Sequence, residues 1–64
     1  MTARDVIKLL TSFGWLEDRQ VGSHKHFKKE DNPNIVTVPT HGKSDIPLGT
    51  LKNIERKSGV KLTK

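Results

Sequence analysis

The chain has 64 residues, no cysteine and a formal net charge of +5 from 12 Lys and Arg against 7 Asp and Glu. The lack of cysteine excludes disulfides and thiolate zinc sites as sources of stability, so a chain this short must depend on one packed core. We therefore expect a single domain over residues 1–64. A pI near 9.9 favours a polyanionic partner such as RNA, DNA or an acidic protein.

The apolar runs are too short to cross a membrane, and the N-terminal residues enter an amphipathic pattern without the apolar core of a signal peptide. These features predict a soluble, cytoplasmic protein with no membrane partner.

A capping box at residues 2–5 predicts the start of the first helix. In this motif the hydroxyl of Thr2 accepts a hydrogen bond from a free backbone N–H, and the carboxylate of Asp5 accepts one in return. Gly14 is suited to end the helix. Apolar residues at spacings of three and four predict one buried stripe, made of Val6, Leu9, Leu10 and Phe13.

The middle of the chain alternates short β-type segments with turn signals. Strands are predicted at residues 15–20, 23–29 and 35–38, separated by turns at Gly22 and at residues 30–34, and Pro39 should end the third strand. Trp15 is expected to pack in the core rather than to stack on RNA. The acidic residues are interpreted as turn and solubility residues: Glu17, Asp18, Glu30 and Asp31.

A second helix is predicted from Pro47 to Gly59, with Leu48, Leu51 and Ile54 on its apolar face and Val60 and Leu62 folding back on it. The element order α-β-β-β-α predicts a two-layer α+β domain, with a three-stranded antiparallel sheet and both helices on one face. The other face should meet water or a ligand.

The candidate site lies in the second strand, where side chains alternate between the two faces of the sheet. Because Phe27 needs burial, it should share the core face with Lys25 and Ser23. The other face then carries His24, His26 and Lys28. Two imidazoles and an ammonium group are the mixture needed to bind phosphate and move protons near neutral pH.

Other interpretations of the histidines remain open at this point. Histidines on an exposed strand are often only solvated polar residues. His24 and His26 could also bind a metal together with His41 and Asp45, although a His-x-His pair alone is a weak zinc signal. Ser23 is an unsuitable nucleophile for His24, since neighbouring residues of a strand point to opposite faces.

The sequence resembles the HicA family of bacterial and archaeal type II toxins, which are small ribonucleases with a double-stranded-RNA-binding-domain-like fold. The similarity covers almost the full length. Four segments in chain order carry it: Phe-Gly-Trp at 13–15, Arg-Gln-Val-Gly-Ser-His at 19–24 followed by Phe27, Val-Thr-Val-Pro-Thr-His at 36–41, and Pro-Leu-Gly-Thr-Leu at 47–51 followed by Ile54 and Gly59.

The resemblance implies that His24 is the catalytic residue of an enzyme that cleaves messenger RNA without a metal cofactor. It also implies a HicB-type antitoxin that covers the His24 face. Bound RNA is expected to contact residues around this histidine: Arg19, Ser23, Lys25, His26 and Lys28. Lys25 is the weakest member of this group, because the alternation places it on the core face.

Two other functions are also compatible with the sequence. The charge alone would also suit a non-catalytic RNA- or DNA-binding module, which needs Lys and Arg but not His24. An interaction subunit that docks an acidic protein is a third possibility, and it overlaps with the toxin hypothesis because a toxin also binds its antitoxin.

Overall fold

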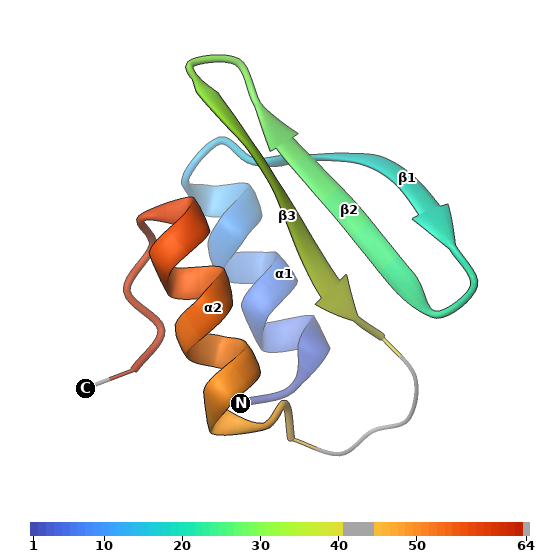
Figure 1. Ribbon diagram of the computed structural model, residues 1–64, viewed down its shortest axis with the longest axis vertical. Helices are drawn as coiled ribbons and strands as arrows, with labels where there is room; N and C mark the ends of the chain where they lie inside the picture. The colour runs from blue at the N-terminus through green and yellow to red at the C-terminus, as the bar shows by residue number, and fades with distance from the viewer. Residues whose placement is uncertain (41–44, 64) are drawn as a thin grey trace.

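A computed structural model describes residues 1–40 and 45–63 and has the element order α-β-β-β-α. The elements are α1 (Ala3–Ser12), β1 (Leu16–Val21), β2 (His24–Lys29), β3 (Asn32–Pro39) and α2 (Leu48–Ser58). Figure 1 shows the two helices side by side, on the same side of the sheet. The predicted two-layer α+β architecture is therefore confirmed.

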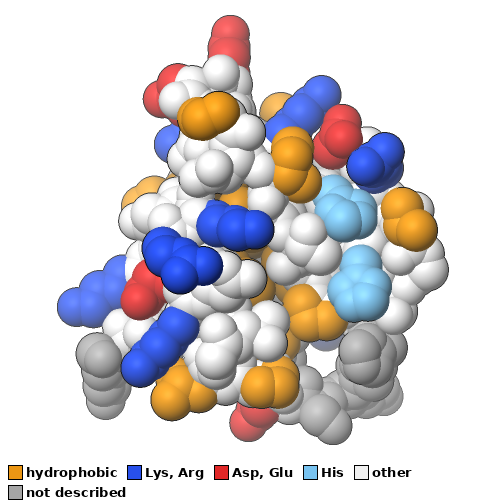
Figure 2. Space-filling view, viewed as in Figure 1, with side chains coloured by type: hydrophobic (Ala, Val, Ile, Leu, Met, Phe, Trp, Pro, Cys, Tyr) orange, Lys and Arg blue, Asp and Glu red, His pale blue; other side chains and the backbone are white. Residues whose placement is uncertain are grey.

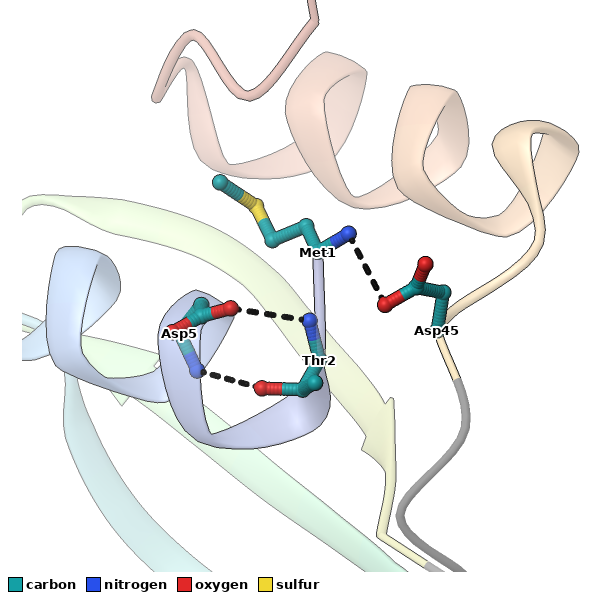
Figure 3. Close-up of polar contacts among 4 residues, drawn as sticks. All are labelled: Met1, Thr2, Asp5 and Asp45. Atoms are coloured by element: carbon teal, nitrogen blue, oxygen red, sulfur yellow. Dashed lines mark hydrogen bonds and ion pairs between the residues drawn. The ribbon is translucent and has the colours of Figure 1, made fainter.

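The start of α1 has the predicted capping box (Figure 3). The N–H of Asp5 donates to Thr2 Oγ1 over 3.3 Å, and the N–H of Thr2 donates to Asp5 Oδ2 over 3.0 Å. The second of these bonds lowers the pKa of the Asp5 carboxyl, since it stabilises the charged form. The amino group of Met1 lies 3.3 Å from Asp45, and the N–H of Ile46 donates to the Met1 carbonyl over 2.8 Å. These contacts join the start of α1 to the segment before α2.

The sheet is an antiparallel meander with strand order β1-β2-β3. Only Gly22 and Ser23 separate β1 from β2, and Val21 pairs with His24 across this turn. Gly22 has φ +58°, a backbone conformation that glycine adopts without the steric cost of a side chain. A two-residue hairpin turn with glycine in its first position therefore places His24 at the first residue of β2.

β3 is longer than predicted. The expected turn over residues 30–34 is only Glu30 and Asp31, and the segment from Asn32 to Asn34 belongs to the strand. Pro33 is tolerated there because β3 is an edge strand, where a missing backbone N–H need not break the ladder. The pairing of β2 with β3 is irregular at this end, with a register shift between Phe27 and Lys29.

The core lies between the helices and the sheet. Trp15 is fully buried, as predicted, although its indole N–H has no hydrogen-bond acceptor among the described residues. The prediction that Phe13 and Leu48 belong to the apolar faces of the helices was wrong. Phe13 is 56% exposed because α1 ends at Ser12, and Leu48 is 58% exposed at the first residue of α2. The buried apolar residues are Val6, Leu10, Trp15, Phe27, Val36, Val38, Ile46, Leu51, Ile54 and Val60.

The chain after α2 folds back as predicted. Gly59 ends the helix with φ +74°, and Val60 is buried. The carboxylate of Glu55 accepts backbone hydrogen bonds from Leu62 over 2.6 Å and from Thr63 over 2.9 Å. Both bonds lower the pKa of the Glu55 carboxyl, and the bond from Thr63 has the larger effect. In the part of the chain described, neither helix is long and apolar enough to span a membrane.

Candidate functional site

The strand register divides the sheet into a covered face and an open face. Phe27 pairs with Val36, and Lys25 pairs with Val38. Since Phe27, Val36 and Val38 are buried, these pairs lie on the covered face, against the helices. Alternation along β2 then places His24, His26 and Lys28 on the open face.

The two histidines occupy neighbouring positions on the open face. His24 is exposed and pairs with Val21 and Pro39, whereas His26 is partly buried and pairs with Arg19 and Thr37. In Figure 2 the pale-blue histidine side chains lie next to each other on the molecular surface. The structure thus brings together the two imidazoles that the sequence placed on one face.

The ring of His26 is held by a hydrogen bond across the sheet. Its Nδ1 lies 2.9 Å from Oγ1 of Thr37, the residue opposite it on β3. The partners are on adjacent strands, so the contact restrains the imidazole above the open face.

Cations lie beside the histidines, but one of them is paired with an acid. Arg19 is exposed and lies opposite His26. Lys28 Nζ lies 3.2 Å from Asp18 Oδ1, and Asp18 lies in an irregularity of β1 between Glu17 and Arg19. The interpretation of Glu17 and Asp18 as turn residues was wrong, because both belong to β1 and reach lysines of β2.

Lys25 does not join the open face. It pairs with the buried Val38, and its Nζ lies 3.3 Å from Glu17 Oε1 at the covered side of the sheet. The predicted face of Lys25 is therefore correct. Although Lys25 was a candidate RNA contact, its side chain lies on the side of the sheet opposite to His24.

Ser23 has a role in the geometry of the turn. Its carbonyl oxygen accepts hydrogen bonds from the N–H of Thr40 over 2.6 Å and from the Thr40 hydroxyl over 2.8 Å. The end of β3 is thereby fastened to the turn that precedes His24. Of the residues considered for a metal site, His41 lies outside the described residues.

Residues 3–60 match the family model described as HicA toxin of bacterial toxin-antitoxin. The chain belongs to the HicA toxin family. A search of curated proteins found no match. Membership identifies the chain as a toxin of the bacterial toxin–antitoxin type, in agreement with the resemblance seen in the sequence.

The open face of this HicA protein also carries apolar side chains that the sequence analysis did not single out. Leu16 pairs with Lys28 and is 64% exposed, and Val21 pairs with His24 and is 58% exposed. Ile35 alternates with the buried Val36 and is 46% exposed. Strand alternation applied to β1 and β3 would have found them. Orange groups flank the histidines in Figure 2.

A metal centre is not assembled from the described part of this HicA chain. Across residues 1–40 and 45–63, no three His, Asp or Glu side chains gather closely enough to hold an ion. Asp45, considered as a ligand, instead lies against the amino group of Met1. The open face offers two imidazoles, cations and apolar side chains, a combination suited to a phosphodiester and its bases.

Proposed function

We propose that this HicA toxin is a metal-independent ribonuclease that cleaves messenger RNA, with His24 as a catalytic residue. The observation that carries the proposal is the position of His24 on the uncovered face of the sheet, beside His26 and on the same face as Arg19 and Lys28. Family membership supports it, because the family consists of toxins of toxin–antitoxin systems.

The chemistry uses the substrate's own 2′-hydroxyl as the nucleophile. A base removes its proton as O2′ attacks phosphorus, and an acid protonates the departing 5′ oxygen. Cations stabilise the negative charge that builds up on the phosphoryl oxygens. His24 transfers one of these protons, and Arg19 and Lys28 bind the phosphate, with Lys28 exchanging its contact with Asp18 for one with RNA.

A HicB-type antitoxin inhibits the toxin by covering the His24 face. The exposed side chains of Leu16, Val21 and Ile35 would supply the apolar area of this interface, with charged residues at its rim. The working location of such a pair is the cytoplasm, where messenger RNA is found.

The test compares the wild-type protein with His24→Ala on messenger RNA in the presence of a chelator. We expect cleavage by the variant to fall by about 10²- to 10⁴-fold, the usual contribution of a general acid or base. Growth arrest should be lost as well, while circular dichroism shows a folded protein. Thr11→Ala, at an exposed position of α1, is the matched control and should cleave normally. A His24→Ala protein with the normal rate would refute the catalytic role.

A non-catalytic RNA- or DNA-binding module is the second candidate, favoured by the exposed cations of α2. Lys52, Arg56 and Lys57 are exposed, and Figure 2 shows Lys and Arg side chains gathered over this helix. Such a module binds RNA with a logarithmic affinity that falls linearly with the logarithm of salt concentration. In the chelator experiment it would leave bound RNA intact, whereas the ribonuclease leaves fragments.

A further inference from the structure

We propose that His26 is a second catalytic residue, which shares with His24 the two proton transfers of RNA cleavage, and that Thr37 positions it. The inference rests on the proposed ribonuclease function and goes beyond it, since that function requires a single histidine. Three observations carry it: the shared face, the hydrogen bond to Thr37, and the charges around the ring.

The spacing of the two histidines along β2 suits a phosphodiester bound between their side chains. Residues i and i+2 of a strand project from the same face, and their Cα atoms are about 7 Å apart. In an in-line displacement the attacking and departing oxygens lie on opposite sides of phosphorus, so one group near each oxygen is needed. His24 and His26 supply two such groups, and β2 fixes the distance between their backbone positions.

The contact with Thr37 leaves the other ring nitrogen of His26 to exchange protons. When Nδ1 donates its proton to the Thr37 hydroxyl, that nitrogen stays protonated throughout the reaction, and Nε2 gains or loses the mobile proton. The hydroxyl can also rotate to donate. Thr37 touches the ring and not the reacting atoms, and is therefore a positioning residue.

The charges that face His26 come from all three strands. β1 contributes Arg19, the residue that pairs with His26 in the strand register. β2 contributes His24 and Lys28, the latter paired with Asp18, and β3 contributes the neutral Thr37. None of the ion pairs within residues 1–40 and 45–63 joins a carboxylate to the imidazole of His26. The anion that fits this setting is the phosphodiester itself.

The step balances without a further reactant. One imidazole accepts the 2′-hydroxyl proton as the O2′–P bond forms. The other imidazolium gives its proton to the 5′ oxygen as the P–O5′ bond breaks. The products are a 2′,3′-cyclic phosphate and a 5′-hydroxyl end, and the two histidines finish with their protonation states exchanged.

The experiment measures kcat/KM against pH for the wild-type protein, His26→Asn and His26→Arg on one RNA substrate. The wild-type profile should be bell-shaped, with one limb for the group that must be neutral and one for the group that must be protonated. Asn keeps a side-chain amide near Nδ1 for Thr37, and Arg keeps a positive charge, but neither exchanges a proton near neutral pH. Both variants should lose one limb and about 10²-fold or more in kcat.

The arginine variant separates catalysis from phosphate binding. If His26 only held phosphate, His26→Arg would retain wild-type kcat and His26→Asn would mainly raise KM. That result, or a profile with both limbs intact in His26→Asn, would overturn the inference while leaving His24 catalysis in place. If the wild-type protein cuts no RNA, the proposed function itself fails.

Thr37 is tested by removing and then restoring its hydroxyl. Thr37→Val should lower kcat by about threefold to tenfold, the value of one net hydrogen bond, and Thr37→Ser should restore it. The effect should disappear in the His26→Asn background if Thr37 acts through His26. Equal loss in both backgrounds would show that the hydroxyl has a different role.

Discussion

The covered and open faces of the sheet are built from alternate residues of the same strands, yet only the covered face has a fully buried apolar centre, and only the open face carries histidines. On the covered face Phe27 and Val36 are packed against the helices. On the open face His24 and His26 stand between cations and exposed apolar side chains. Adjacent residues of a strand therefore have different roles, one in the core and the next in the candidate site. A slip of one residue in register would exchange the two faces.

The largest loss of stability is expected from a substitution of Phe27 on the covered face. Phe27→Ala removes a large, fully buried side chain, so the free energy of unfolding should fall by about 3–5 kcal/mol. A chain of 64 residues has little stability in reserve, and we expect this variant to be largely unfolded.

Denaturant titration followed by circular dichroism measures this change, with Lys28→Ala as the control from the next position on the strand. The exposed pair of Lys28 with Asp18 contributes little, so the control should differ from the wild type by less than about 0.5 kcal/mol. Comparable losses in the two variants would show that the two faces are not divided as described.

Gly22 lies in the turn between β1 and β2, which fixes the register of the two strands. Gly22→Ala forces a side chain into a positive φ and should cost about 1–2 kcal/mol of stability, although nothing lies within 4 Å of the added carbon. Cleavage should also fall, because His24 starts the strand right after this turn. Thermal melting and an RNA cleavage assay measure both effects.

Gly49→Ala is the matched control for this substitution. Gly49 lies in α2 without a positive φ, and nothing lies within 4 Å of its added carbon either. This control should keep full activity and gain up to about 1 kcal/mol of stability. If Gly22→Ala behaved in the same way, the turn would not be what sets the register.

The smallest expected effect is on the pH dependence of stability. It involves Glu55 of α2, in the helical layer that covers the sheet. Its lowered pKa means that it stabilises the folded state above the ordinary carboxyl pKa of 4.5, and that this contribution is lost as the pH falls through the folded-state value. Melting temperatures between about pH 7 and about pH 3 should therefore fall further for the wild type than for Glu55→Gln. Parallel pH curves would show that the hydrogen bonds to Leu62 and Thr63 add no pH-dependent stability.

Much of the fold could be read from local patterns in the sequence. The capping box at Thr2, the turn glycine and the alternation around Phe27 each depend on residues close together in the chain, and the structure has them as predicted. The face of His24 followed from the same alternation. The catalytic role of His24 stays a prediction, which the His24→Ala variant tests.

What the sequence could not provide depends on partners from other elements. Phe13 fits the helical stripe, but α1 ends one residue before it, and its ring is left exposed. Pro33 looked like a turn residue because the sheet order, which makes β3 an edge, is a tertiary property. The contacts of Asp18 with Lys28 and of Thr37 with His26 required the strand register, which single-strand patterns do not contain.

The meander order of the strands has a consequence for how the chain folds. Each strand pairs with its neighbour along the chain through a two-residue turn, so little loop entropy is lost, and hairpins of this kind form in about 1–10 μs. By contrast, α1 must reach β3 across the two intervening strands. We therefore expect the surface with the two histidines to form from the parts of the chain whose pairing costs the least loop entropy.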